Sequence, residues 1–340
     1  MRALIIGGTH FIGPHVVSAL HRFGHEITLY HRGHHEPDLP EAVRHIHSPR
    51  AGIPVLHFPP ALTDPPPEVV LHMFPVGEDD TRAIVGRFSG LARRLVVISS
   101  GDVYLAYGRL LGKEPGPPEP IPLTENAALR SVLYPYRHMA AGPADWTFHY
   151  EKILVEREVL GQASLRGTVL RLPPVYGPGD PYRRLRPYIK RMVDGRSTIL
   201  LESAQMNWRW THGYVENVAD AIALTVTDER SAGEVYNLGE ADTPTIGQRV
   251  NRIGALMGWD GTVVSLEMDR LPPHLRAPYE PQQDLVLSTE HIRTQLGYTE
   301  AVSPEEALRR TIAWERAHPS AVGDPGATEY AAEDASLLHA

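Results

Sequence analysis

A chain of 340 residues is long enough for one large α/β domain or two unequal ones. Its 33 basic and 41 acidic residues give a net charge of −8, which argues against a nucleic-acid partner. Cysteine is absent, which excludes disulfides, thiolate nucleophiles and cysteine-based zinc sites, and no apolar run has the length of a membrane span. We therefore expect a cytoplasmic protein without a signal peptide, with a small-molecule partner and neither a nucleic-acid nor a membrane partner.

Strand-like and helix-like segments alternate through the first half of the chain, which indicates a parallel sheet. The predicted strands cover residues 2–6, 26–30, 68–73, 95–98 and 168–171. The predicted helices cover residues 11–23, 79–92, 145–161, 181–194, 216–227, 244–257 and 303–317. A stretch rich in proline and histidine after residue 30 is predicted to be irregular, and residues 108–122 form a loop long enough for a lid.

The first motif directly follows the first predicted strand and opens the first predicted helix. Its sequence is Gly7-Gly8-Thr9-His10-Phe11-Ile12-Gly13. Glycines at such a turn let a pyrophosphate approach the N-terminus of the helix, so we predict a dinucleotide cofactor there. The predicted cofactor contacts are Gly7, Thr9, His10, Phe11, Ile12 and Gly13. His10 stands at the middle glycine of the common GxxGxxG form.

The end of the second predicted strand bears on the choice of nucleotide. Arg32 follows it, where an acidic residue would bind the ribose hydroxyls of NAD. An arginine suits a 2′-phosphate, so we predict NADP with Arg32 as its contact, and NAD is the alternative. His31, His34 and His35 lie nearby, but adjacent histidines in a loop without a partnered carboxylate are more often exposed to solvent. We therefore predict no metal site.

Three further motifs follow later strands and helices. Ser99-Ser100-Gly101-Asp102-Val103-Tyr104 comes at the end of a buried strand, where a hydroxyl points into the ligand crevice of a doubly wound sheet. Phe148 precedes Lys152 by four residues, so the two side chains share one face of the predicted helix 145–161. The last of these motifs runs from Arg171 to Gly179 with the sequence RLPPVYGPG.

Together these segments resemble the extended short-chain dehydrogenase/reductase superfamily, in its NAD-dependent epimerase/dehydratase family. The matching pieces are GGTHFIG, SSGDVY, KILVE and RLPPVYGPG, in the family's order. The segment from Gly213 to Ala219 is similar to the family's HVDDVA segment, and the segment from Glu234 to Gly239 to its YNxG strand. The resemblance runs from residue 1 to about residue 318.

The resemblance implies a Rossmann-type α/β fold, a doubly wound parallel sheet with a smaller C-terminal substrate-binding lobe. We expect residues 1–175 to form the NAD(P)-binding domain, which also receives later segments near 211–240. Residues 176–318 are expected to form mainly the substrate-binding lobe, and residues 319–340 a disordered tail. The family implies an epimerase, dehydratase or reductase activity, usually on a nucleotide sugar, and we expect a homodimer.

The resemblance also implies roles for single residues. Ser100 would hydrogen-bond the substrate oxygen, while Lys152 would hold the nicotinamide ribose and lower the pKa of the base. The family's base is a tyrosine four residues before that lysine, and Phe148 replaces it here. Further contacts are predicted from Ser99, Pro174 and Val175 to the cofactor, and from Tyr104 and Arg209 to the substrate.

Because phenylalanine carries no acidic proton, another group has to move the proton if the chain is an active enzyme. Asp102 is the preferred candidate, since the family's dehydratases have an acidic residue two positions after the serine or threonine. Tyr150 is two residues from Lys152 and is predicted to face away from the crevice; Tyr104, Tyr107 and His138 are further candidates.

Three hypotheses stay open on the reaction. The chain is a redox enzyme with a different acid or base such as Asp102, or a nucleotide-binding isomerase, lyase or pseudoenzyme without redox chemistry. In the third hypothesis, the chain is an engineered Tyr-to-Phe variant of an active enzyme, changed at position 148.

Overall fold

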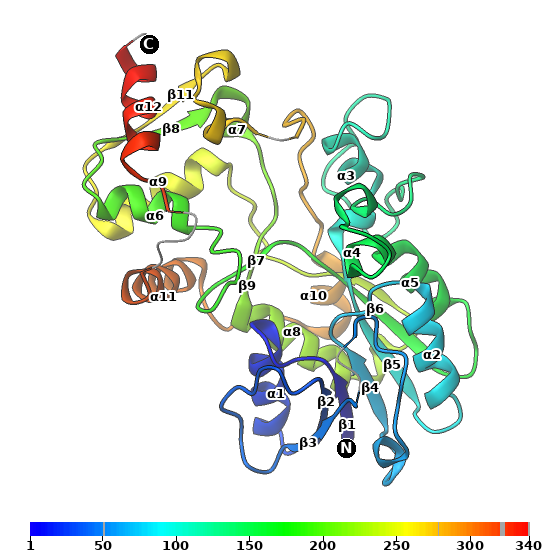
Figure 1. Ribbon diagram of the computed structural model, residues 1–340. Coiled ribbons are helices and arrows are strands. Elements are labelled where there is room, and N and C mark those ends of the chain that lie inside the picture. The colour runs from blue at the N-terminus through cyan, green and yellow to red at the C-terminus, as the bar shows by residue number, and fades with distance from the viewer. Residues whose placement is uncertain (50–51, 278, 320–323, 339–340) are drawn as a thin grey trace.

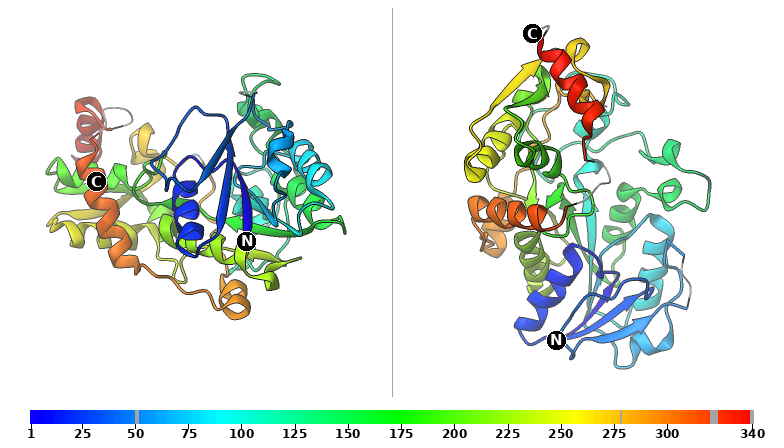
Figure 2. Two further views of the ribbon diagram at one scale, coloured as in Figure 1. Left: turned by 90° about the horizontal axis from the view of Figure 1, so that it is seen from below. Right: turned by 60° about the vertical axis from the view of Figure 1, so that its left-hand side comes forward.

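The computed structural model describes residues 1–49, 52–277, 279–319 and 324–338, and Figure 1 shows the order of the elements along the chain. A larger lobe at the N-terminal end is built around a parallel sheet, and a smaller lobe carries the C-terminus at the opposite end of the molecule (Figures 1 and 2). Of the helices among these described residues, none is long and apolar enough to cross a membrane.

The sheet of the larger lobe has seven strands in the order β10-β6-β5-β4-β1-β2-β3, and every neighbouring pair is parallel. Its strands are β1 (Arg2–Ile6), β2 (Glu26–His31), β3 (Arg44–His47), β4 (Val69–His72), β5 (Arg94–Ser100), β6 (Arg166–Leu172) and β10 (Val235–Asn237). Strand order runs outward in both directions from β1 and β4, which is the arrangement of a doubly wound Rossmann-type sheet. The predicted fold class is confirmed.

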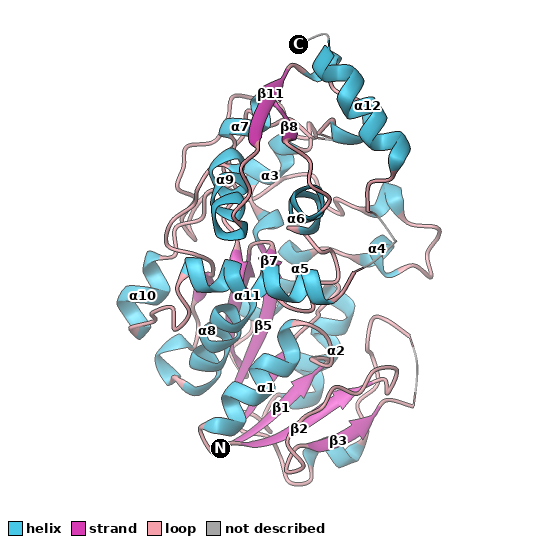
Figure 3. Ribbon diagram, turned by 90° about the vertical axis from the view of Figure 1, so that its left-hand side faces the viewer, coloured by secondary structure: helices cyan, strands magenta, loops and turns pink. Residues whose placement is uncertain are grey.

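Helices cover both faces of this sheet, which is why its central strands are apolar on both sides. Ile5 of β1 belongs to the core beneath α1 (Ile12–Arg22) and α8 (Val215–Thr227), whereas Leu4 and Ile6 belong to the core on the opposite face. That second core lies beneath α2 (Glu78–Phe88) and α5 (Lys152–Leu160). Figure 3 shows α1 and α8 side by side against the sheet.

The smaller lobe contains β8 (Thr198–Glu202) and β11 (Thr262–Leu266), which pair in parallel. Around them lie α6 (Arg186–Val193), α7 (Ser203–Asn207), α9 (Ile246–Met257), α11 (Pro304–Ala317) and α12 (Ala327–Leu338). A short pair, β7 (Val175–Tyr176) with β9 (Gly213–Tyr214), lies between the lobes. The remaining helices are α3 (Leu105–Leu110), α4 (Trp146–His149) and α10 (Glu290–Leu296), with 3-10 turns at Pro60–Thr63, Gly101–Val103, Arg137–Met139, Glu229–Ser231, Met268–Arg270 and Pro273–Leu275.

The predicted helix 145–161 is wrong in one respect, because two helices replace it. α4 ends at His149, and α5 begins at Lys152. Between them Glu151 is extended, with φ −156° and ψ 98°, and its carboxylate accepts a hydrogen bond from the amide of Ile153. Its side chain is fully buried in an ion pair with Arg130 at 2.9 Å. This buried pair holds the chain out of helical geometry at the point where the sequence pattern predicts continuity.

Other segments also differ from the prediction, including the unpredicted strands β8 and β11 of the smaller lobe. β3 forms within the stretch that was expected to be irregular, and it is the edge strand of the sheet. α12 forms within the expected disordered tail, where Glu333 is buried and pairs with Arg191. Residues 320–323 and 339–340 of that tail lie outside the described residues.

Candidate active site

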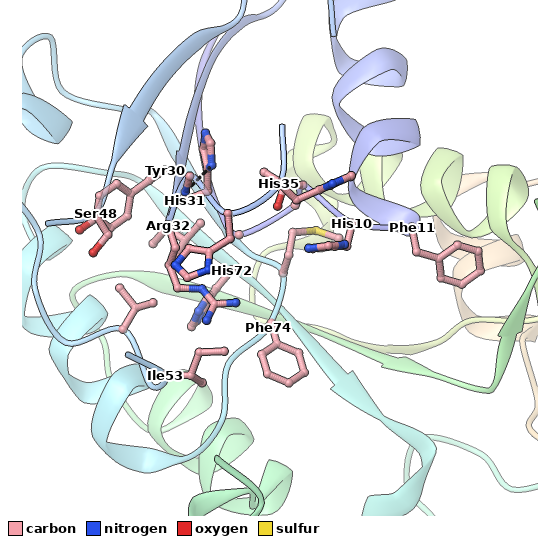
Figure 4. Close-up of a pocket in the computed structure, with 18 of the residues that line it drawn as sticks. His10, Phe11, Tyr30, His31, Arg32, His35, Ser48, Ile53, His72 and Phe74 are labelled. Carbon is pink, nitrogen blue, oxygen red and sulfur yellow. Dashed lines mark hydrogen bonds between the residues drawn. The ribbon is translucent and has the colours of Figure 1, made fainter. Parts of the chain in front are cut away.

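The glycine-rich turn forms one wall of a cavity of about 420 Å³ at the carboxyl ends of β1, β2 and β4 (Figure 4). Gly7 and Gly8 have φ of 81° and 85°, a left-handed conformation that favours glycine. A Cβ on Gly13 would lie 2.1 Å from the carbonyl oxygen of Gly8, so the first turn of α1 can approach the loop only without a side chain there. The loop and the helix N-terminus therefore fit the pyrophosphate of a dinucleotide.

Of the residues of this turn that were predicted to contact the cofactor, Gly7, Thr9, His10, Phe11 and Ile12 line the cavity, whereas Gly13 is not in the described lining. The His10 ring, which replaces a glycine, stacks on His35 at 4.4 Å between ring centroids.

Arg32 also lines this cavity, and its guanidinium points into it beside His72 (Figure 4). The His72 side chain is buried, its Nδ1 has no hydrogen-bond partner among the described residues, and burial lowers its pKa to about 3. The sequence motifs did not single out His72, because it ends an apolar strand and belongs to no motif.

A second cavity, of about 540 Å³, adjoins the first at the carboxyl end of β5. Phe74 and Trp146 line both cavities, with 5.3 Å between their ring centroids. The polar lining of the second cavity includes Ser100, Asp102, Tyr107, Tyr136, Tyr150 and Arg184. Two neighbouring chambers, one beside a dinucleotide turn and one beside hydroxyl and carboxyl groups, suit a cofactor and a substrate.

Asp102 is the centre of a hydrogen-bonded group of tyrosines in this second cavity. Its Oδ2 accepts from the hydroxyls of Tyr150 at 2.9 Å and Tyr136 at 3.1 Å, and the Tyr136 and Tyr107 hydroxyls lie 2.9 Å apart. Its Oδ1 is buried without a hydrogen-bond partner in the described part of the chain. Ser100 Oγ accepts from the backbone amide of Asp102 at 3.2 Å.

Burial favours the protonated forms of Asp102 and Tyr150, because it raises the pKa of both side chains. Burial raises the pKa of Asp102 above its ordinary value, against the lowering effect of Arg130 and of the tyrosine hydrogen bonds. Burial and the neighbouring Asp102 carboxylate raise the pKa of Tyr150, against a hydrogen bond from Ser100. A proton that enters the group is therefore held well by the carboxyl group of Asp102.

Lys152 lies behind this group of hydroxyls. Its Nζ donates to the carbonyl oxygens of Pro75 at 2.5 Å and Ile98 at 3.0 Å, and it lies 5.3 Å from the centroid of the Tyr150 ring. Burial lowers the pKa of Lys152 to about 8. Lys152 is absent from the described lining of both cavities, and the charged groups that act on it are Asp102, Asp80 and Glu156.

Phe148 lies away from both cavities as the described residues outline them. Its ring is stacked under the guanidinium of Arg137 at 4.6 Å, and its backbone oxygen accepts from Arg137 Nε at 2.9 Å. Tyr150, which was predicted to face away, instead has its hydroxyl on Asp102. Both geometric predictions are wrong because they assumed one continuous helix.

The other predicted site residues divide into those near the cavities and those in the protein interior. Pro174 lines the second cavity, whereas Val175 is buried in the core and Ser99 Oγ donates to Glu156 at 2.5 Å. The substrate contacts predicted for Tyr104 and Arg209 are not found in the described lining. Tyr104 is fully buried and donates to Asn237 at 2.6 Å, and Arg209 pairs with Asp284 at 3.0 Å.

Tyr136 and Arg184 are among the lining residues of the second cavity that the sequence motifs missed. Tyr136 lies in a loop, and Arg184 precedes α6, and neither position has a spacing signal to another motif. Arg184 pairs with Asp180 at 2.7 Å and presents a cation at the second cavity, the role that was expected of Arg209.

Comparison with known proteins bears on the family. Residues 92–239 match the model of the NAD dependent epimerase/dehydratase family. The resemblance predicted from the motifs is confirmed over these residues. A UDP-N-acetyl-alpha-D-glucosaminuronate decarboxylase of Bacillus cytotoxicus is 25% identical to this chain over an alignment of 340 positions, which covers 93% of this chain and 98% of that protein.

Solved structures of epimerases share the fold. UDP-glucose 4-epimerase of Thermotoga maritima, with UDP-glucose, has a TM-score of 0.66 at 19% identity, over 93% of this chain and 99% of that one. UDP-glucuronic acid 4-epimerase of Bacillus cereus, in complex with UDP-glucuronic acid and NAD, has a TM-score of 0.66 at 17% identity, over the same shares. At these identities the likeness shows the Rossmann-type fold alone.

Proposed function

We propose that the protein is an NAD-dependent enzyme of the epimerase/dehydratase type that acts on a nucleotide sugar. In this proposal Tyr150 and Asp102 move the proton that the family's missing tyrosine would move. The observation that carries it is the 2.9 Å hydrogen bond from the Tyr150 hydroxyl to Asp102, in a cavity that adjoins the dinucleotide cavity. The relative that decarboxylates a UDP-sugar acid and the epimerases solved with UDP-sugars support the substrate class.

NAD is the proposed cofactor, because structures of similar fold contain it. The residues that would hold it are the turn from Gly7 to Ile12 at the pyrophosphate and the Arg32 region at the adenosine end. When bound there, NAD would supply reversible hydride transfer at a substrate carbon. NADP, which was predicted first on the ground of Arg32, becomes the alternative, and parallel titrations of the two nucleotides decide between them.

The proposed proton path uses three side chains of the second cavity. A substrate hydroxyl beside Ser100 gives its proton to the Tyr150 oxygen, and Tyr150 passes its own proton to Asp102 Oδ2. One O–H bond breaks and one forms at each transfer, and Asp102 ends as a neutral carboxyl group. Because burial raises the pKa of Asp102, that carboxyl group is a suitable place to hold the proton until it returns.

The position of Phe148 bears on the hypothesis of an engineered origin. The Phe148 ring lies under Arg137 and outside the described lining of both cavities, so a hydroxyl added to it is not expected to join the group of Asp102 and Ser100. The structure thus favours Tyr150 over a restored tyrosine at position 148. A non-redox isomerase, lyase or binding protein remains the second candidate, and bound-nucleotide absorbance separates it from the redox enzyme.

The test compares two substitutions. The protein is incubated with NAD and, separately, UDP-glucose, UDP-glucuronic acid and UDP-N-acetylglucosaminuronic acid, and products are followed by NMR. We expect Tyr150→Phe to lower turnover by about 10²–10⁴-fold while NAD still binds, because it removes the hydroxyl and keeps the ring. Phe148→Tyr is the matched control and is expected to leave turnover unchanged. A large gain in Phe148→Tyr, with no loss in Tyr150→Phe, would show the proposed proton path to be wrong.

A further inference from the structure

We propose that His31, His45 and His47 form a binding site for a divalent transition-metal ion, with Zn²⁺ as the ion that the site suits. One ring nitrogen from each histidine lies within 4.8 Å of the others. The chain has no cysteine, so imidazole is its available nitrogen or sulfur ligand for such an ion. The absence of a metal site was expected from the sequence because His34 and His35 were considered as partners of His31, and these two lie outside the cluster.

The sheet brings the three histidines together from two segments. His31 ends β2, and its register partner on the parallel edge strand β3 is His47. His45 and His47 are two residues apart on β3, so their side chains leave the same face of the sheet. The His31 ring lies edge-on to both, with ring centroids 5.1 Å from His45 and 4.7 Å from His47.

The distances between the ring nitrogens of the three histidines are close to those of a zinc site. His31 Nε2 and His45 Nδ1 are 2.9 Å apart, the distance of a shared proton, which a metal ion can replace. Zinc bound to three imidazoles at 2.0–2.1 Å needs nitrogens about 3.3 Å apart. His31 is buried and fixed, whereas the His45 and His47 side chains are exposed and can rotate to reach that spacing.

A carboxylate completes the group. Glu36 Oε1 lies 2.7 Å from His47 Nε2, so it orients this ring and offsets part of the charge of a cation. Carboxylate partners of this kind fix the tautomer and raise the basicity of a ligating histidine. The group faces solvent through His47, which is about half exposed, so an ion can enter without opening the fold.

The site is coupled to the proposed cofactor cavity through His31. His31 lines that cavity, and its Nδ1 accepts from the backbone amide of Gly33 at 3.2 Å. A metal ion on Nε2 places the ring proton on Nδ1, so the Gly33 amide loses this acceptor and the loop after β2 has to adjust. Metal binding is therefore expected to change the affinity for the nucleotide as well.

The test uses the full chain after dialysis against EDTA, titrated with ZnCl₂ by calorimetry. We expect one Zn²⁺ per chain, and we expect His45→Ala and His47→Ala each to weaken binding by more than about 100-fold, since loss of an outer carboxylate partner alone costs about 10–100-fold. Co²⁺ is expected to give the visible absorption of tetrahedral nitrogen ligation. Both substitutions replace exposed side chains, and circular dichroism verifies the fold.

His34→Ala is the matched control, because His34 is exposed on the same loop and lies outside the cluster. It is expected to bind Zn²⁺ like the unchanged protein. Equal Zn²⁺ affinity in the unchanged protein and in a His45→Ala/His47→Ala double variant would overturn the proposal, as would an equal loss in His34→Ala. Titration of NAD with and without Zn²⁺ then measures the coupling separately.

Discussion

Lys152 is an ammonium group held by backbone carbonyls in the interior, and burial lowers its pKa to about 8 from 10.5. Between these values the unfolded chain holds the proton and the folded protein does not, so folding stability rises with pH. Relative to Lys152→Met, the unchanged protein should gain up to about 3 kcal/mol in unfolding free energy from pH 8 to pH 10.5. Urea unfolding of both proteins across this range checks the sign, and a pH-independent difference would contradict it.

The sequence predicts the positions of some residues in the candidate site and not of others. Asp102 and Ser100 follow a buried apolar strand, and strand ends in a doubly wound sheet meet at the ligand crevice, so both were predictable. Tyr150 was not, since its direction depends on a helix break made by Glu151 and Arg130, twenty-one residues apart in the chain. A local helical pattern contains no information about such a distant buried pair.

At the scale of elements, the break between α4 and α5 is the feature that sets the geometry of the proposed proton path. Glu151 accepts hydrogen bonds from Arg130 and Ile153, and it has no exposed side-chain surface. Glu151→Ala leaves the Arg130 charge buried without its partner, which typically costs about 3–5 kcal/mol.

Urea unfolding measures this loss, and Glu158→Ala on the same helix is the control. Glu158 pairs with Arg82 on the surface, where such pairs contribute about 1 kcal/mol or less. If the two variants lose equal stability, the pair at Glu151 is not what holds the break.

The elements that the sequence missed share one physical reason. β3 is a short edge strand of the sequence Arg-His-Ile-His, which lacks the apolar run of a central strand and is held by its register with β2. The central strands were predictable because helices on both faces require them to be apolar throughout. Elements fixed by pairing or by ion pairs from distant segments leave only a weak local pattern.

At the scale of the whole molecule, α12 lies on the smaller lobe, far from β1 and α1, which carry the glycine-rich turn (Figures 1 and 2). Its Glu333 is buried against Arg191 of α6 and lies 3.1 Å from His274, and Leu337 packs on the apolar group of Leu200, Leu266 and Leu271. The lobe therefore depends on residues that composition alone assigned to a disordered tail.

Removal of residues 325–340 is expected to destabilise the smaller lobe, because it removes the ion pair of Glu333 with Arg191 and uncovers the apolar group on which Leu337 packs. Breaking a buried ion pair alone typically costs about 3–5 kcal/mol. Nucleotide binding should persist, since the glycine-rich turn and Arg32 belong to the other lobe. Thermal unfolding and an NAD titration of the truncated chain measure the two effects separately, and Glu333→Ala, which keeps the helix, is expected to reproduce most of the loss. A truncated protein as stable as the full chain would mean that α12 does not anchor the lobe in solution.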